Sequence, residues 1–391
     1  DYPGDLIFNG DSTKITRAGL NNGLQVDTAY KLTPVHTLRS GVFYSHETFS
    51  SYASVATFPC CDAMGNQTST SPISFNDNSQ SSATFAGLYV QDEWKALDKV
   101  TLNYGARMDS VGGYVTGSQL SPRLGAVYKP FAATTVHAGY ARYFTPPRQE
   151  FVATASVARF ANTTAESSVP VNSPVRAERA HYLDAGVTQR IIPGLTVGLD
   201  GYYKLSEYHL DEGQFGAPTF LTPFNYHTAS NIGIELTTSY AAGGFSGYGN
   251  LAAAQQVAKG IVSAQALFSA DDLAYIHDHY IVTDHSQLIT ASAGLAYLWR
   301  RTRFSLDLLV GSGLRRTVRH PNDATNPPYQ QLDFGITHRF TLPAFGTMEA
   351  RFDLINVLGQ NYVLRDGTGV GIFAKQFGPP RGFFGGLKKE F

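Results

Sequence analysis

The sequence has few charged residues and no long apolar segment. Asp, Glu, Lys and Arg make up 16% of the 391 residues, whereas about 25% is usual for a water-soluble protein. Apolar stretches are interrupted within a few residues, as Asp307 interrupts 306–310, so none approaches the roughly 18 residues that a membrane-spanning helix needs. The net charge of -1 provides no basic field of the kind that binds nucleic acid. We therefore expect neither a transmembrane helix nor a nucleic-acid partner.

Cysteine is also scarce. The two cysteines, Cys60 and Cys61, are adjacent, in a segment rich in Ser, Asn and Pro, and no CxxC motif occurs. A disulfide between neighbours brings the two Cα atoms closer than in most disulfides. We interpret the pair as a bridge that tightens a loop or as two inert thiols, in preference to a redox or metal contact.

Signals for secretion and catalysis are absent as well. The first residues, Asp1–Gly4, are not a charged segment followed by an apolar core, as a secretory signal would be. The chain has no GxSxG, no HExxH and no Gly-rich phosphate loop between a strand and a helix. The sequence thus predicts no enzymatic activity, no catalytic residue and no cofactor. We also expect that the chain is processed or begins within a longer protein.

What the sequence does have is a two-sided pattern. In 99–109, KVTLNYGARMD, apolar residues alternate with small, polar or charged ones, and 195–206, 331–340 and 348–354 repeat the pattern. Side chains on a strand alternate between two faces, so each strand has one apolar and one polar, charged side. A soluble sandwich also alternates. The few charges and the long strands instead favour a closed sheet with lipid outside and a polar interior.

Short and long links alternate along the chain, as in an up-and-down barrel with periplasmic turns and extracellular loops. We predict an all-β fold, an antiparallel transmembrane β-barrel over residues 1–391, with the long links near 52–82, 110–118, 146–178, 208–228, 258–285, 316–328 and 359–379. Because bacterial single-chain barrels have even strand numbers, an odd count implies further strands upstream. About fifteen strands are expected, at 22–32, 36–50, 84–96, 99–111, 119–129, 134–145, 180–191, 195–207, 230–241, 245–256, 287–299, 303–315, 329–341, 346–358 and 381–391.

Several motifs carry a family resemblance. They are GLYVQDEWK (87–95) with KVTLNYGARMD (99–109), SPRLG (121–125), HAGYARYFTPP (137–147), RAER (176–179) with AGV (185–187), NIGIEL (231–236) and RFDLINVLGQNY (351–362). In this order they resemble the C-terminal part of the β-barrel of TonB-dependent outer-membrane receptors. The chain departs from the family pattern in having Ala185 for a Glu, and Val357-Leu358-Gly359 for Leu-Phe-Asp.

The resemblance implies a location in the outer membrane of a Gram-negative bacterium and part of a larger barrel, of 22 strands. The plug domain and the TonB box of the family are absent from the sequence and are expected upstream. The implied partners are outer-membrane lipid and lipopolysaccharide, the protein's own plug, TonB, the barrel assembly machinery and a small ligand, most often an iron–siderophore complex. A passive porin or adhesion barrel and a membrane-embedded hydrolase are the alternatives.

Four groups of candidate residues follow. Tyr143 and Arg148 lie beside a long loop, where an aromatic and an arginine suit ligand recognition, although packing of the loop is the simpler interpretation. Phe391 is a terminal aromatic that the resemblance assigns to recognition by the assembly machinery. His277, His279 and His285 form a His/Asp cluster with Asp278 and Asp284, in which metal or ligand contact is the alternative to an ordinary polar loop. Charges of both signs predict contact with a polar plug across the lumen or a solvated wall: Arg107, Asp109, Arg123, Asp200, Lys204, Glu235, Asp333, Arg339, Glu349, Arg351 and Asp353.

Overall fold

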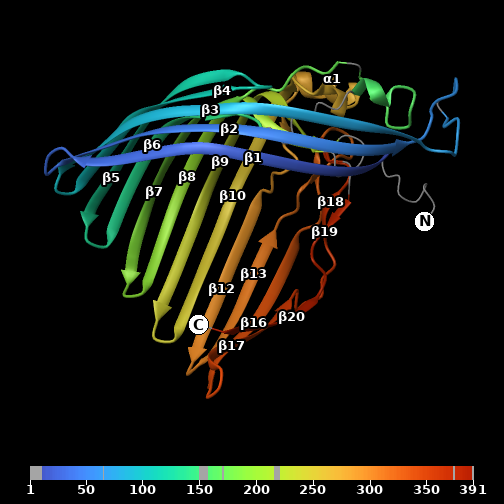
Figure 1. Ribbon diagram of the computed structural model, residues 1–391. Coiled ribbons are helices and arrows are strands. Elements are labelled where there is room, and N and C mark those ends of the chain that lie inside the picture. The colour runs from blue at the N-terminus through green and yellow to red at the C-terminus, as the bar shows by residue number, and fades with distance from the viewer. Residues whose placement is uncertain are drawn as a thin grey trace.

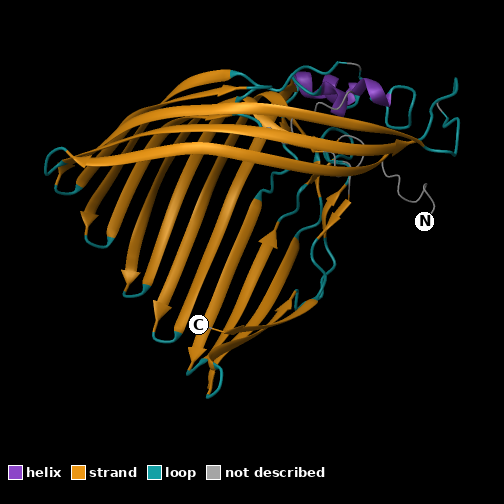
Figure 2. Cartoon of the chain, viewed as in Figure 1, coloured by secondary structure: helices purple, strands orange, loops and turns teal. Residues whose placement is uncertain are grey.

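The computed structural model describes residues 11–64, 66–148, 157–169, 171–214, 221–372 and 375–389. One strongly curved antiparallel sheet dominates this part of the chain (Figure 1, Figure 2). Its fifteen long strands follow the order β1-β2-β3-β4-β5-β6-β7-β8-β9-β10-β12-β13-β16-β17-β20, and β11 pairs beside β10. Strands that follow one another in the chain are therefore neighbours in the sheet. The predicted all-β, up-and-down architecture and the predicted fifteen strands are confirmed.

The strands of the main sheet have lengths of up to 25 residues, while the remaining elements belong to the loops. No helix among the described residues is long and apolar enough to cross a membrane. The elements are β1 (Asp11–Lys31), β2 (His36–Thr57), β3 (Ile73–Leu97), β4 (Val100–Gly112), β5 (Gly117–Phe131), β6 (Thr134–Thr145), η3 (Val157–Phe160), β7 (Glu178–Ile192), β8 (Leu195–Gln214), β9 (Leu221–Ala242), β10 (Phe245–Ile261), η4 (Gln265–Leu267), α1 (Ala270–Asp278), β11 (Ile281–Val282), β12 (Ile289–Trp299), β13 (Thr302–Gly311), β14 (Arg315–Arg316), β15 (Ala324–Thr325), β16 (Tyr329–Leu342), β17 (Gly346–Ile355), β18 (Val363–Asp366), β19 (Lys375–Phe377) and β20 (Gly382–Lys389).

Short turns gather at one end of the sheet and long connections at the other (Figure 1). The turns are tight because glycine supplies the left-handed backbone that two of them require, with a φ of 86° at Gly194 and 58° at Gly243. The sheet is not closed: within the described residues, β1 pairs only with β2, and β20 only with β17. Whether the complete barrel has 22 strands stays a prediction.

Several strands extend further toward the long loops than the sequence predicts. The expected loop at 52–82 contains the last part of β2 and the first part of β3, and the expected loop at 208–228 contains the ends of β8 and β9. In these extensions polar residues occupy both faces, as in 76–82, NDNSQSS. Alternation is imposed by lipid on one side, so it fades where a strand continues beyond the bilayer.

A helix is a second difference. The expected loop at 258–285 contains α1, whose N-cap Ser269 accepts a hydrogen bond from the backbone N–H of Asp272. Ser followed by two acidic residues in the first turn, Asp271 and Asp272, is the local signal for a helix start. The helix is too short to be recognised by periodicity alone.

Register keeps the two faces of the sheet distinct. Leu199 lies opposite Val187 and Leu236, while the next residue, Asp200, lies opposite Gly186 and Glu235. Because facing residues share a side of the sheet, an apolar row and a charged row run side by side across β7, β8 and β9. The two-sided pattern of the sequence is thus a property of the whole wall.

Buried side chains show which face is concave. Val55 on β2 and Ala229 on β9 belong to one hydrophobic cluster with Phe160, Phe268 and Ile276 of the loops. β2 and β9 are seven strands apart in the sheet order, so they meet only if their faces look toward each other across the bore. Through the registers, Val55 and Ala229 share their face with Arg107 and Asp200. The charged face therefore lines the bore, and the face with Leu199 points outward.

Candidate functional site

The inner wall carries pairs of opposite charge. Arg107 Nε lies 2.7 Å from Asp109 Oδ1, and Arg351 Nε lies 2.6 Å from Asp353 Oδ2. Residues i and i+2 of a strand share a face, so these pairs follow directly from sequence spacing. Across strands, Arg339 and Glu349 are 3.0 Å apart. Such half-exposed pairs stabilise a fold by about 0–1 kcal/mol and leave their charges available to a partner in the bore.

Acidic groups of β7, β8 and β9 are only partly compensated. His137 Nε2 lies 3.0 Å from Asp200 Oδ1 and 3.5 Å from Asp184 Oδ2. Glu235 faces Asp200 in register, and like charges in this position repel. No hydrogen bond or ion pair links Glu235 to another described residue. This patch of three carboxylates and one imidazole suits a cationic partner from the lumen.

The other candidates of the inner wall have different surroundings. Lys204 Nζ lies 2.5 Å from Glu178 Oε1. Asp333 Oδ1 accepts hydrogen bonds from the side chain of Gln331 and from the backbone N–H of Asn356. The side chain of Arg123 makes neither a hydrogen bond nor an ion pair with any described residue. The structure thus places all eleven predicted charges on the inner face, paired to different degrees.

A buried network around Glu178 was missed by the sequence analysis. Besides Lys204, this carboxylate accepts from Ser206 Oγ at 2.9 Å, from the Leu210 N–H at 3.0 Å and from His209 Nδ1 at 3.0 Å. His209 reaches it because Tyr208 has a φ of 53°, which shifts the alternation of β8 by one residue. The register between β8 and β9 continues through this position without a shift, so the left-handed residue leaves no signal in an alternating pattern.

The sequence analysis did not anticipate the carboxylate of Asp92 on the outer face. Asp92 lies on the same face of β3 as Val90 and Trp94. Its Oδ2 lies 2.6 Å from His36 Nδ1 and 2.9 Å from the Tyr104 hydroxyl. His36 also stacks on Trp94, with ring centroids 5.6 Å apart. Two polar partners and an aromatic pair near the short turns explain how a carboxylate is tolerated at this position.

At the other end of the bore, loop segments cover the strand ends. Tyr143 is on the inner face of β6 and packs against Tyr182, with ring centroids 5.9 Å apart. Arg148 lines a cavity of about 270 Å³ together with Asp211, Glu212 and His285. The structure therefore brings Arg148 and His285 to one cavity and places Tyr143 at another, described below. The sequence analysis had grouped Tyr143 with Arg148.

The three histidines do not come together. His277 is in α1 and lies 2.8 Å from Asp278, whereas His285 Nδ1 lies 3.2 Å from Asp211. His279 stacks on Tyr275 at 4.3 Å, and Tyr275 stacks in turn on His320 at 4.6 Å. Among the described residues, no group of three or more His, Cys, Asp or Glu side chains is arranged to hold a metal ion. The three histidines are separated because His277 belongs to α1, His279 is its C-cap residue and His285 lies beyond β11.

Two neighbouring loop residues titrate in a perturbed environment. Burial raises the pKa of Asp284, although Arg365 Nε lies 2.8 Å away. The hydrogen bond to Asp211 raises the pKa of His285 above its ordinary value of 6.5. Both shifts make the folded loop favour the protonated form, so each contribution is lost as the pH rises through the raised pKa.

We expect the loop at 283–288 to open more readily as the pH rises through the raised pKa of His285. Deprotonation of His285 weakens its bond to Asp211. Amide hydrogen exchange of the loop, corrected for intrinsic rates, should become several-fold faster. His285→Gln should abolish this dependence and His277→Gln should retain it. A pH-independent opening in the unmodified protein would contradict the assignment.

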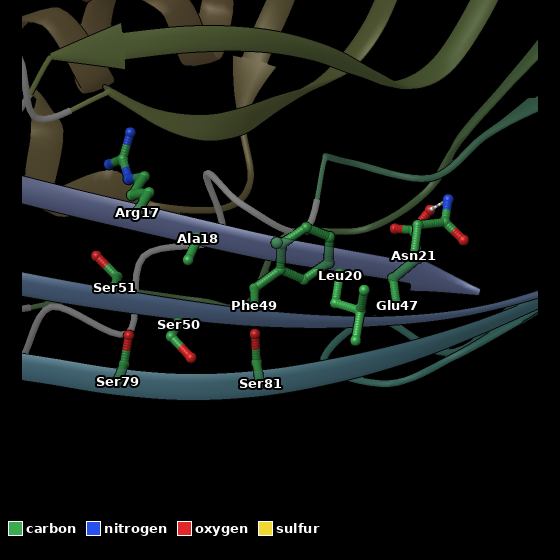
Figure 3. A pocket seen from close by; sticks show the side chains of 11 residues that line it. Arg17, Ala18, Leu20, Asn21, Glu47, Phe49, Ser50, Ser51, Ser79 and Ser81 are labelled. Carbon is green, nitrogen blue, oxygen red and sulfur yellow. Dashed lines mark hydrogen bonds between the residues drawn. The ribbon is translucent and has the colours of Figure 1, made fainter.

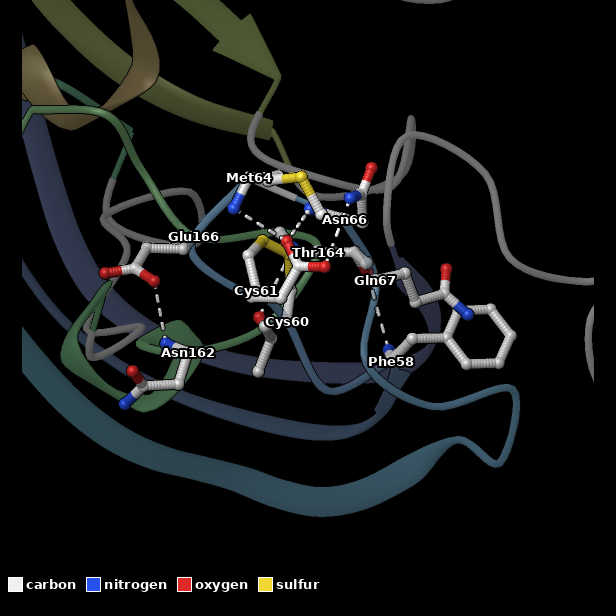
Figure 4. Close-up of a disulfide and its surroundings, with 12 residues drawn as sticks. Phe58, Cys60, Cys61, Met64, Asn66, Gln67, Asn162, Thr164 and Glu166 are labelled. Carbon is white, nitrogen blue, oxygen red and sulfur yellow. Dashed lines mark hydrogen bonds between the residues drawn. A yellow bond between two sulfur atoms is a disulfide. The ribbon is translucent and has the colours of Figure 1, made fainter.

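Two further features border the long loops. A cavity of about 380 Å³ lies on the inner face of β1, β2 and β3, and Figure 3 shows Phe49 in the middle of its lining, between Arg17 and the hydrogen-bonded pair Asn21 and Glu47. In the β2–β3 loop, Cys60 and Cys61 form a disulfide (Figure 4). The Cys60 N–H donates to the Asn162 carbonyl at 2.9 Å, which ties this loop to the segment before β7. The bridge interpretation is confirmed.

The last candidate, Phe391, lies outside the described residues. In β20, Phe383 and Leu387 are both exposed and share a face with Leu354 and Ala350 of β17. That face is the outer one, because Arg351 and Asp353 lie on the inner face. The assembly role of Phe391 stays a prediction.

Known proteins share this architecture. A family model described as TonB dependent receptor-like, beta-barrel, matches residues 2–357. The TonB-dependent transporter Oar of Myxococcus xanthus is 29% identical over 153 residues, which are 35% of this chain and 14% of Oar. The ferric-catecholate import receptor Fiu from E. coli K12 superposes with a TM-score of 0.68 at 13% identity, over 97% of this chain and 55% of Fiu.

Two other solved structures are similar. The copper transporter OprC has a TM-score of 0.63 at 17% identity, over 97% of this chain and 57% of OprC. The FrpB iron transporter from Neisseria meningitidis, in its apoprotein form, has a TM-score of 0.60 at 16% identity, over 96% of this chain and 56% of FrpB. The chain therefore spans about half the length of these structures, and the likeness to them is one of fold.

Proposed function

Since the chain belongs to the TonB-dependent receptor family through its β-barrel, we propose that it forms part of the wall of an outer-membrane receptor that imports a scarce nutrient with energy supplied through TonB. The observation that carries this proposal is the inner wall, which is charged, incompletely paired and covered at the loop end. A passive pore also has a polar interior, so dependence on TonB is the property that distinguishes the two. The catalytic motifs that the hydrolase alternative requires do not occur in the sequence.

We propose that the inner wall contacts a plug domain. The carboxylates of Asp184, Asp200 and Glu235 crowd one area with a single imidazole between them. Buried charges are stable only when they are paired, so basic side chains of a plug would complete this patch. Arg339 is already paired with Glu349, and Arg351 with Asp353. The lone pairs and N–H groups that these pairs leave free toward the bore suit weaker contacts, which a moving plug can exchange.

For the cargo we propose a small-molecule complex, with an iron–siderophore complex as the first candidate. Support comes from the solved structures of similar fold, which include a ferric-catecholate import receptor and an iron transporter. A copper transporter has the same fold, so the fold does not choose among metals. The proposed location is the outer membrane of a Gram-negative bacterium, where lipid and lipopolysaccharide surround the apolar face and the assembly machinery inserts the barrel.

Uptake in cells tests the function. A strain that lacks the gene should lose accumulation of the cognate ⁵⁵Fe-labelled complex, and a tonB deletion should lose it equally while surface binding remains. A passive porin predicts uptake that does not depend on TonB, and an adhesion barrel predicts no uptake with or without TonB. Accumulation that persists without TonB would therefore reject the proposal in favour of the porin alternative.

A further inference from the structure

The seam between β5 and β6 is open at the loop end of the barrel. Their pairing ends at Arg123 and Ala141. Beyond this point β5 continues to Gly117 with β4 as its partner, and β6 continues to Thr145 with β7 as its partner. Pro122 stands directly after the last pair and offers no N–H to either neighbour. β5 and β6 therefore separate at Pro122, where β5 cannot continue the backbone hydrogen bonds to β6.

A side chain, not the backbone, bridges the separated strands. Gln119 on β5 is buried, and its Nε2 donates to the Tyr143 carbonyl of β6 at 2.9 Å. Its Oε1 accepts from Arg179 of β7 at 3.2 Å, and Arg179 also donates to the Ser118 carbonyl at 3.1 Å. These contacts hold the seam at a fixed width. The space beside them is consequently a formed cavity and not a fluctuating gap.

This seam cavity has a volume of about 340 Å³ and an excess of positive charge. Arg107, Arg123 and Arg142 line it together with one carboxylate, that of Asp109. Three guanidinium groups and one carboxylate leave two positive charges uncompensated. The consecutive residues Arg142, Tyr143 and Phe144 all contribute to the lining, so the cavity is bordered by both faces of β6.

Two of the three arginines have side-chain donors without an acceptor among the described residues. Arg107 donates through Nε to Asp109, but the side chain of Arg123 makes no hydrogen bond or ion pair within the described residues. Arg142 Nε is buried and has no hydrogen-bond partner among the described residues. A buried cationic donor without an acceptor is unfavourable. The donors of the cavity are therefore suited to an anion.

The backbone of β3 keeps this charge accessible. A Cβ at Gly87 would lie 2.8 Å from Asp109 Oδ1 and 3.0 Å from Arg107 Nη2. Glycine therefore lets the ion pair lie flat against the sheet, where a larger residue would push it into the cavity. Phe43, Phe85 and Phe144 supply apolar surface around the guanidinium groups.

We propose that the seam cavity binds the oxyanionic group, a phosphate or a carboxylate, of an amphiphilic ligand. Guanidinium groups bind both anions through paired N–H donors, and the phenylalanines cover the apolar part attached to the anion. Such a ligand has two sources: a soluble molecule that enters from the loop side, or the phosphorylated glycolipid of the outer leaflet. The inference stands on the cavity alone and does not depend on the uptake function.

Titration calorimetry of the intact protein in detergent tests the site with phenyl phosphate as the probe. Arg123→Gln and Arg142→Gln should each weaken binding at least tenfold, since each removes one of the unpaired cations. Phenol, which lacks the anion, should not bind. Arg301→Gln, at an exposed turn on the opposite end of the barrel, is the matched control and should bind as the unmodified protein does. Heat-modified migration in electrophoresis confirms that each variant is folded.

The outcomes separate the two sources and can overturn the site. Native mass spectrometry of protein purified from outer membranes should show bound lipopolysaccharide that both variants lose if the source is the lipid, and no lipid if the source is soluble. Phenyl phosphate binding that is absent, or equal in all four proteins, would refute the site. If the unmodified protein binds phenyl phosphate but supports no TonB-dependent uptake, the proposed function would be rejected and the site would stand.

Discussion

Ile234→Arg should destabilise the barrel by about 2–4 kcal/mol, the cost of an arginine on the lipid face near the middle of a bilayer. Ile234 is half exposed and lies opposite Gly201 of β8 and Ala253 of β10, well away from both ends of β9. Its face is the outer one, so the substituted guanidinium would enter hydrocarbon. The measurement is the free energy of unfolding in guanidinium chloride, for protein inserted into lipid vesicles.

The adjacent residue provides the control. Glu235→Arg introduces the same side chain one position along β9, on the inner face and opposite Asp200. There a cation replaces one of two facing carboxylates, so stability should be unchanged or slightly higher. Equal losses at positions 234 and 235 would show that the sheet does not separate lipid from lumen as described.

Alternation is the part of the fold that the sequence predicts best. Lipid on one side and charge on the other act on every second residue, so KVTLNYGARMD identifies β4 and the row from 195 to 206 identifies β8 within a few residues. The strand extensions and α1 do not show this alternation, because water or covering loops surround them on both sides. Their stability comes from contacts distant in sequence, such as Phe75 with Phe160, which a single sequence does not display.

The candidate site divides in the same way. Spacing predicts the pairs Arg107–Asp109 and Arg351–Asp353, since i and i+2 share a face. It does not predict the network of Glu178, which needs a left-handed backbone at Tyr208 and a partner 31 residues away, His209. The seam cavity depends on where β5 and β6 cease to pair. Pro122 was the local signal for that interruption, within a motif that the sequence analysis used only for its family resemblance.

Asn225→Ala should release the cover at the loop end of the barrel. Asn225 is fully buried, and its Nδ2 donates to the carbonyls of Arg176 at 3.0 Å and Tyr208 at 2.7 Å. Its Oδ1 accepts from the Arg176 N–H at 2.7 Å and from Ser263 Oγ at 2.9 Å. One side chain thus joins the segment before β7, the backbone of β8 at Tyr208 and the segment after β10.

Alanine leaves three backbone groups and one hydroxyl without partners, and each buried group left unpaired costs about 1–3 kcal/mol. Because water enters the opened space and recovers part of this loss, we expect a local destabilisation of about 3 kcal/mol. Amide hydrogen exchange at 171–177 and 262–269 should become on the order of 100-fold faster, while the membrane-spanning strands keep their protection.

A second asparagine distinguishes the role of the buried network from the loss of an amide as such. Asn250 is exposed on the inner face of β10 and donates one hydrogen bond, to Ser292 Oγ at 3.2 Å. Asn250→Ala removes the same atoms from a solvated position, so exchange in the loops should not change. If Asn225→Ala left the loops as protected as Asn250→Ala does, the hydrophobic cluster of Phe160, Phe268 and Ile276 would be sufficient to hold the cover. The hydrogen bonds of Asn225 would then orient the segments without stabilising them.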